Sequence, residues 1–247
     1  MRRTIAIACP VSFCGLLVLA LSQPALFSQV PQSPGEGTSL RPEITEHFHR
    51  MLRYHLRMDG NVPDGSVLFI GDSLVQGLCT DAVACPSVNY GIGQDTTVGV
   101  LTRLPQYRSL LRASALVLEI GANDMSRRDN QQIIENYRQI LDAVPRSIPV
   151  VCSAVLPVNE RLLSPPDESA NARIRDFNAL LEALCSADSR CVFVNPASRL
   201  VDADGNLAAA LHDGDGVHPN SDGNRIWIDE LRAALQKARA HVSSVAP

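Results

Sequence analysis

The sequence of 247 residues predicts an α/β protein, a three-layer α/β/α sandwich built on a five-stranded parallel sheet. Two observations lead to this fold class. Short apolar runs recur along the chain, and segments with helix-like apolar spacing separate them. The runs are continuously apolar and do not alternate with polar residues, which is typical of parallel strands that are buried on both faces.

Each predicted element rests on a local pattern, and "ALVLEIG" at 115–121 is the clearest strand. The five strands are expected at residues 66–71, 86–93, 115–121, 148–158 and 191–196. The helices are expected at 41–58, from a start at 74–79, at 96–112 around Pro105, at 130–144, at 168–186 and at 222–240. No period along the chain indicates a repeat.

The N-terminus has the pattern of an export signal. Arg2 and Arg3 precede an apolar run, and small residues follow it at Ala20-Leu21-Ser22. Residues 1–22 are therefore predicted to be a signal peptide, 23–40 a flexible leader rich in Pro, Ser, Gly and Gln, and 41–247 a single domain. The expected location is periplasmic or extracellular. The alternative is an uncleaved N-terminal anchor, in which case the chain would contact a membrane.

The predicted export affects the expected oxidation state of the cysteines. Cys79 and Cys85 are close in sequence, as are Cys185 and Cys191, and each pair spans a predicted loop. In an oxidising compartment we expect both pairs to form disulfides, with Cys152 left over in an apolar strand. The alternative is a cytosolic enzyme with five reduced thiols.

Composition and charge exclude several classes of function. A formal net charge of −4 provides no basic surface for nucleic acid. His47, His49 and His55 lie on the first predicted helix, where we expect them to face solvent and not to bind a metal. The sequence contains no C-x-x-C motif, the pattern that would indicate a zinc site. We therefore expect neither a metal nor a cofactor.

Polar residues follow the ends of the predicted strands. They are Gly71-Asp72-Ser73 after the first strand, 91–96 after the second, Gly121-Ala122-Asn123-Asp124 after the third, and the segment 212–220 beyond the fifth, which holds Asp215 and His218. Parallel strands bring their carboxyl ends to one edge of the sheet, where ligands bind. Acyl transfer needs a hydroxyl nucleophile, a base, an orienting carboxylate and N–H donors for the oxyanion.

Each of these motifs also has a simpler structural interpretation. Ser73 could cap a helix, and Asn123 could be a turn residue. Asp72 and Asp124 are expected to anchor their loops by hydrogen bonds to backbone N–H groups. The four motifs together, in order and at strand ends, favour a catalytic site.

The chain resembles the SGNH, or GDSL-type, hydrolase superfamily. Within it, the chain is most similar to the branch that includes platelet-activating-factor acetylhydrolase catalytic subunits and bacterial acyl esterases. The resemblance covers about residues 65–238 and rests on "GDSLVQG", "NYGIGQDTT", "GAND" and "DGVHP". It implies a flavodoxin-like three-layer fold. It also implies that Ser73 is the nucleophile, that His218 is the general base, and that Asp215 orients the imidazole. The oxyanion donors would be the Ser73 backbone N–H, a backbone N–H of the second motif, and the Asn123 side chain.

The second motif departs from the family pattern at one position. That branch usually has G-I-G-G-D-T, and the final glycine supplies an oxyanion N–H, whereas this chain has Gln94 there. We assign the donor to Gln94, with Gly93 as the alternative. Glutamine resists the positive φ that glycine permits, so we expect a reshaped or narrowed hole.

The sequence therefore predicts a serine esterase that removes a short acyl group, acetyl first of all, from a small-molecule, carbohydrate or lipid ester. One alternative is a non-catalytic glycan- or lipid-binding module on a hydrolase scaffold. A metal-dependent phosphoesterase is the other, although few histidine and carboxylate ligands are available for paired ions. The loop 156–169 after the fourth strand is expected to influence substrate choice.

Overall fold

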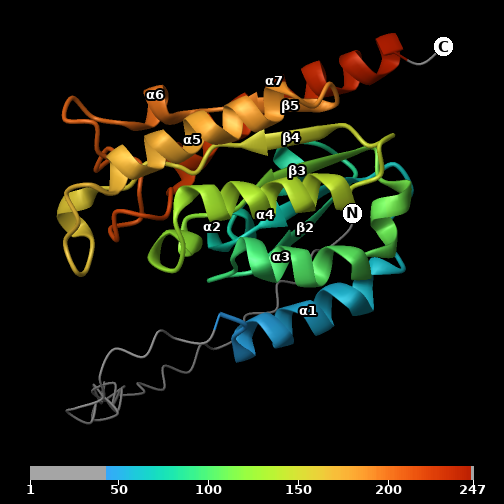
Figure 1. Cartoon of the computed structure of the whole chain (residues 1–247), viewed down its shortest axis with the longest axis horizontal. Helices are drawn as coiled ribbons and strands as arrows, with labels where there is room; N and C mark the ends of the chain where they lie inside the picture. Colours follow the sequence, from blue (N-terminus) through green and yellow to red (C-terminus); the bar gives the residue numbers. More distant parts are fainter. Residues whose placement is uncertain (1–42, 246–247) are drawn as a thin grey trace, which may run out of the picture. The chain divides into compact units, whose positions relative to one another are not determined.

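The computed structural model describes residues 43–245, with side chains described up to residue 240, and these residues belong to one compact unit, Leu40–Pro247 (Figure 1). The predicted signal peptide and leader, residues 1–22 and 23–40, lie outside the described residues. Within 43–245, no helix is both long and apolar enough to cross a membrane.

The centre of the molecule is the five-stranded parallel sheet that the sequence predicts. Its strands are β1 (Val67–Gly71), β2 (Ser87–Gly91), β3 (Ala115–Glu119), β4 (Val150–Ser153) and β5 (Cys191–Val194). They lie in the order β2-β1-β3-β4-β5, and every pair is parallel. Gly71 pairs with Gly91 on one side and with Glu119 on the other, so the first three strands end level with one another. The loops that follow them therefore start at one edge.

Helices cover both faces of the sheet (Figure 1). One face is covered by α1 (Glu46–Asp59), α3 (Thr97–Arg103), α4 (Asn130–Ala143) and α5 (Ala170–Ser186), and the other by α2 (Ser73–Gln76), α6 (Ala197–Leu200) and α7 (Ser221–Val245). Alternation along each strand supplies both cores, because Leu68 and Ile70 join the first core while Val67 and Phe69 join the second. Burial on both faces explains why the strands are continuously apolar.

Short 3₁₀ turns replace helix at several points. These turns are η1 (Thr80–Ala82), η2 (Leu104–Gln106), η3 (Arg108–Arg112), η4 (Asn123–Ser126) and η5 (Glu160–Leu162). The helix predicted at 96–112 is therefore only partly correct, because α3 ends at Arg103. Pro105 lies in the first turn of η2, and its missing N–H and its ring prevent the α-helix from continuing.

The first helix has a buried face that includes a histidine, which corrects one expectation. His55 does not face solvent: it is 2% exposed, and its Nδ1 lies 3.0 Å from the Tyr107 hydroxyl. Burial, together with the nearby Arg103 charge, lowers the pKa of His55 to about 3. Phe48, Leu52 and His55 recur at helical spacing, and this periodicity places the imidazole in the core.

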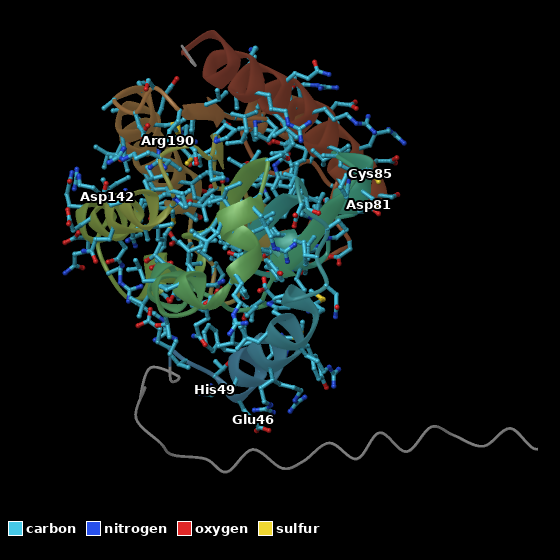
Figure 2. All side chains as sticks on the ribbon, turned by 90° about the vertical axis from the view of Figure 1, so that its right-hand side faces the viewer. Glu46, His49, Asp81, Cys85, Asp142 and Arg190 are labelled. Atoms are coloured by element: carbon cyan, nitrogen blue, oxygen red, sulfur yellow. A yellow bond between two sulfur atoms is a disulfide. The ribbon has the colours of Figure 1, made fainter. Side chains whose placement is uncertain are left out.

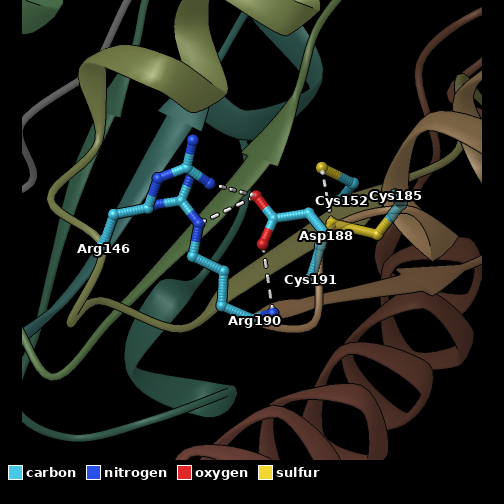
Figure 3. Close-up of a disulfide and its surroundings, with 6 residues drawn as sticks. All are labelled: Arg146, Cys152, Cys185, Asp188, Arg190 and Cys191. Atoms are coloured by element: carbon cyan, nitrogen blue, oxygen red, sulfur yellow. Dashed lines mark hydrogen bonds and ion pairs between the residues drawn. A yellow bond between two sulfur atoms is a disulfide. The ribbon is translucent and has the colours of Figure 1, made fainter.

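One of the two expected disulfides is present. Cys185 and Cys191 are bridged, with Cα atoms 5.2 Å apart, at the turn between α5 and β5. Figure 3 shows Cys152 beside this bridge, and its Sγ lies 3.5 Å from that of Cys191. The Cys191 N–H donates to the Asp188 carbonyl, and this tight turn brings the bridged residues together.

The Cys79–Cys85 disulfide was a wrong prediction. Both thiols are free and exposed, although the two pairs have the same separation in sequence. Figure 2 shows Cys85 and Asp81 at the surface. The intervening residues form η1, and the Ser87 hydroxyl donates to the Asp81 carboxylate at 2.6 Å. A disulfide needs facing Cβ atoms, and sequence separation alone does not determine how these atoms face.

Candidate active site

The loop after β1 places Ser73 at the start of a helix. Asp72 is the cap of α2, because its Oδ1 accepts the Leu74 N–H at 3.0 Å. Ser73 is thus the first helical residue and not the cap, which leaves its hydroxyl free for other contacts. Gly71 allows this sharp entry into the helix, since a Cβ there would lie 2.2 Å from the Glu119 carbonyl oxygen.

Three predicted residues come together across the whole length of the domain. The Ser73 Oγ lies 2.9 Å from His218 Nε2, although the two residues are 145 positions apart. His218 Nδ1 lies 2.5 Å from Asp215 Oδ2. With the Nδ1 proton donated to Asp215, Nε2 is the acceptor for the serine hydroxyl. This is the tautomer that a general base for a serine nucleophile needs.

The Asp215 carboxylate has several donors. Its Oδ1 accepts the N–H groups of Val217 and His218 at 2.8 and 2.9 Å. Burial opposes ionisation, but the hydrogen bonds from the His218 ring and from these N–H groups hold the pKa of Asp215 below its ordinary value. Asp215 therefore stays charged and can stabilise an imidazolium.

His212 shapes the loop that carries Asp215 and His218. Its Nδ1 accepts the N–H groups of Gly214 and Gly216 at 3.0 and 3.3 Å, and its side chain is buried. The Asp213 N–H in turn donates to the His218 carbonyl at 3.0 Å. His212 thus supports the loop that carries Asp215 and His218.

The expected oxyanion donors lie on the loops after β2 and β3. Asn123 begins η4, and its Nδ2 donates to the Asp95 carbonyl at 3.0 Å. The Gly93 N–H already donates to Gln76 Oε1 at 2.5 Å. Gln94 has a φ of 66°, so this glutamine holds the left-handed backbone that glycine would adopt, at a cost of roughly 1–3 kcal/mol. The Gly93 N–H and the Asn123 amide thus both donate to acceptors within the protein.

These residues line one pocket of about 670 Å³. The lining includes the apolar side chains of Leu156, Val158 and Val217, and the first two begin the loop that the sequence linked to substrate choice. It also includes the polar side chains of His47, Gln76 and Gln94. Sequence reasoning did not find His47 or Gln76 as pocket residues. His47 lies on α1, and no local pattern indicates that α1 reaches this edge of the sheet.

Buried carboxylates lie beneath the same loops. Asp124 accepts from the Thr97 N–H at 2.9 Å and from the Arg128 guanidinium, and so it anchors its loop as expected. Asp95 forms a fully buried ion pair with Arg103, with 2.8 Å between Nε and Oδ2. Burial, with the nearby Asp95 charge, raises the pKa of Asp72 to about 7, despite the Leu74 N–H that Asp72 accepts.

Glu119 lies at the end of β3 and is completely buried. Neither of its carboxylate oxygens has a hydrogen-bond partner among the described residues. Burial and the neighbouring Asp72 charge raise the pKa of Glu119 well above its ordinary value. Burial therefore favours the neutral form of Glu119.

Two groups of side chains have potential metal-ligand atoms within 4.8 Å of one another. One group is Asp213, Asp215 and His218, and the other is Cys152, Cys185 and Cys191. An ion at the first group would compete with the His218–Asp215 hydrogen bond. In the second group, the disulfide removes two of the three thiolates that a soft metal would need.

Comparison with known proteins gives a family and several related folds. The model of the GDSL-like lipase/acylhydrolase family matches residues 69–226, well over half of the chain. No curated protein sequence matches the chain.

Several solved structures share the fold. A Streptococcus pneumoniae protein described as a platelet activating factor superposes with a TM-score of 0.70 at 24% identity, over 76% of this chain and 92% of that one. A GDSL-like lipase from Bacteroides thetaiotaomicron gives 0.65 at 22% identity, over 76% and 98%. An acetyl-xylooligosaccharide esterase from Geobacillus stearothermophilus gives 0.58 at 14% identity, over 69% and 94%.

Proposed function

The chain belongs to the GDSL-like lipase/acylhydrolase family and is a carboxylic ester hydrolase, and from this premise we propose that it is a serine esterase that removes a short acyl group through an acyl-enzyme. The observation that carries the proposal is the hydrogen-bonded chain from Ser73 through His218 to Asp215, which opens into the pocket. Ser73 is the nucleophile, His218 the general base, and Asp215 the group that orients the imidazole.

The reaction proceeds in two halves. Ser73 Oγ bonds to the ester carbonyl carbon while its proton passes to His218 Nε2, and Asp215 stabilises the resulting imidazolium. The tetrahedral intermediate then collapses, the bond to the alcohol oxygen breaks, and His218 returns the proton to that oxygen. Water, activated by the same imidazole, hydrolyses the acyl-serine and regenerates Ser73.

The oxyanion requires N–H donors that are already in place. The Ser73 N–H belongs to the first turn of α2, where N–H groups have no intrahelical acceptor. The Gln94 N–H and the Asn123 amide lie on the neighbouring loops that line the pocket. We assign these three groups to the oxyanion hole, with the Gly93 N–H as the alternative on the second loop.

We infer a short acyl group, acetyl first of all, from the polar side chains in the pocket lining. An alkyl chain that covered His47, Gln76 and Gln94 would remove them from water without giving them hydrogen-bond partners, which is unfavourable. The same side chains can bind hydroxyl groups, so an acetylated carbohydrate is the favoured substrate and a lipid ester the second. Export to the periplasm or the extracellular space, predicted from residues 1–22, would give the protein access to such substrates.

Hydrolysis of p-nitrophenyl acetate and octanoate tests this proposal. We expect turnover of the acetate, a lower kcat/KM for the octanoate, insensitivity to chelator, and loss of activity in Ser73→Ala. Ser186→Ala, a change at an exposed serine at the end of α5, is the matched control. We also expect a fluorophosphonate probe to label Ser73.

Other outcomes would support the alternatives. Chelator-sensitive phosphatase activity would indicate a metal-dependent phosphoesterase. Binding of acetylated glycans without turnover, in a folded protein that the probe does not label, would indicate a binding module. Acetylated oligosaccharides and lysophospholipids, tested as substrates side by side, would then distinguish the two ester classes.

A further inference from the structure

The backbone at Gln94 is held in a conformation that glutamine rarely adopts. Among the residues that the structure describes, Gln94 is the only one other than glycine with a positive φ. A glycine would adopt this conformation readily, whereas a Cβ makes it unfavourable. Such a conformation persists only where the surrounding contacts impose it. The contacts on either side of Gln94 therefore show what holds the second loop.

The residue after Gln94 is fixed by several contacts. The Asp95 N–H donates to the Ile92 carbonyl at 3.0 Å, and the Asp95 carboxylate binds the buried Arg103. The Asp95 carbonyl accepts from Asn123 at 3.0 Å. All these partners belong to the part of the chain that the family model matches.

The residue before Gln94 is held by the Gln76 side chain. Gln76 Oε1 accepts the Gly93 N–H at 2.5 Å, from the last residue of α2. A Cβ built on Gly93 would lie 3.2 Å from this oxygen and 3.8 Å from Ser73 Cβ, so the contact lies directly beside the nucleophile. Glycine has no side chain to restrict its rotation. The hydrogen bond that Gln76 accepts therefore restrains the Ile92–Gly93 peptide, whose carbonyl in turn accepts the Asp95 N–H.

Gln76 is in turn contacted by α1. His47 Nε2 lies 3.4 Å from Gln76 Oε1, and the ring can donate to it from Nε2. Buried Phe48 packs α1 on the core, and Glu43 accepts the Thr96 hydroxyl at 2.6 Å, so the start of α1 is tied to the start of α3. The position of His47 is thus determined by contacts with the rest of the domain.

We propose that Gln76, supported by His47, is a positioning residue for the oxyanion hole. By holding the Ile92–Gly93 peptide, Gln76 limits the rotation at Gly93 that would turn the Gln94 N–H away from the oxyanion, and it offsets the unfavourable backbone that glutamine introduces there. The proposal rests on the proposed esterase function. It also gives α1, which lies outside the matched residues 69–226, a part in the activity.

A double-mutant cycle tests this role. We expect Gln76→Ala to lower kcat by about 10-fold to 10²-fold with little change in KM, because the oxyanion forms only in the transition state. The rate of Ser73 labelling by the fluorophosphonate should fall in the same proportion. In a Gln94→Gly background the same Gln76→Ala change should cost about 2-fold or less, because glycine adopts the left-handed backbone without support. Equal losses in both backgrounds would overturn the proposal.

Variants of α1 test the supporting contact. We expect His47→Ala to lower kcat by about 2-fold to 5-fold, and His47→Gln, which retains an N–H donor, to restore much of the loss. His49→Ala is the matched control, since His49 is exposed on the same helix. A loss in His49→Ala as large as that in His47→Ala would assign the effect to α1 in general and contradict the role of His47.

Amide NMR gives a readout that is independent of turnover. In Gln76→Ala we expect the Gly93 amide to exchange with solvent at least 10-fold faster and the Gln94 amide signal to shift or broaden. These changes are measurable in a Ser73→Ala background, so they test the positioning role even if no ester is hydrolysed. Unchanged Gly93 and Gln94 signals would overturn the proposal, whereas an inactive wild type with the expected signals would overturn only the esterase function.

Discussion

Two groups of carboxylates serve the same site in contrasting surroundings. Asp215 lies on the loop before α7, with 46% of its side chain exposed, and contacts His218. Asp72, Asp95 and Asp124 lie beneath the loops after β1, β2 and β3 and are buried. Burial raises the pKa of the buried carboxylates, whereas hydrogen bonds hold the pKa of Asp215 low.

The two groups of carboxylates differ in their proposed roles: Asp215 takes part in the reaction, and the buried carboxylates hold the loops. Asp215, which orients His218 in the proposed mechanism, retains access to water and to several N–H donors. A carboxylate that fixes a loop can be buried, provided that cations or N–H groups pair with it, as Arg103 does with Asp95. Changes at the first group should alter activity, and changes at the second should alter stability.

The largest effect is expected for Asp215→Asn. The asparagine can still accept the Val217 and His218 N–H groups, but its NH₂ then faces His218 Nδ1 and favours the wrong tautomer. We expect kcat on p-nitrophenyl acetate to fall by about 10³-fold or more, while the free energy of unfolding changes by about 1 kcal/mol or less because the pair is exposed. A tenfold loss or less would contradict the assignment of Asp215 to the proposed triad.

Arg103→Ala is the corresponding change in the buried group. It removes the partner of Asp95 and the donor to the Tyr90 and Gly71 carbonyls, which leaves a buried charge unpaired. We expect urea denaturation to show a loss of about 3–5 kcal/mol. Arg53→Ala, at an exposed position on α1, should change stability by less than about 0.5 kcal/mol. Equal losses in the two variants would contradict the assignment of stability to the buried pair.

The buried Asp72 should make the stability of the protein depend on pH. The pKa of Asp72 is about 7 in the folded protein and near 3.8 without burial, so the folded state binds the proton over this range and the unfolded state does not. The contribution of Asp72 to stability therefore falls as the pH rises from about 4 to 7. We expect Asp72→Asn, which retains an acceptor for the Leu74 N–H, to remove a decline of roughly 3–4 kcal/mol.

The measurement is the free energy of unfolding of the wild type minus that of Asp72→Asn, at several pH values. Taking the difference removes the contributions of carboxylates such as Asp59, whose pKa is lowered and whose stability contribution has the opposite slope. A difference that does not vary with pH would show that Asp72 is ionised throughout this range.

The smallest effect is expected for Glu119→Gln. The raised pKa favours the neutral form of Glu119, which a neutral amide of the same size resembles. We expect urea denaturation at pH 7 to show a change of about 1 kcal/mol or less. A stabilisation by several kcal/mol would indicate that Glu119 carries an unpaired charge in the folded protein.

Much of the fold and of the site was predictable from local patterns. Continuous apolar runs identified the five strands, and the rule that parallel strands align their carboxyl ends placed Ser73, Asn123 and the loop with Asp215 and His218 at one edge. The local signal was incomplete for His55. The spacing of Phe48, Leu52, His55 and Asp59, all buried, could have placed this histidine on the core face of its helix.

Local sequence patterns predict the order of the elements and the polar residues that follow the strands, because these patterns depend on neighbouring residues. The tertiary structure establishes which side chains contact one another. It brought Gln76 to Gly93 and His47 to Gln76, bridged Cys185 with Cys191 but not Cys79 with Cys85, and gave Gln94 its left-handed backbone. These outcomes depend on the direction of each side chain from a folded backbone, and sequence spacing does not encode that direction.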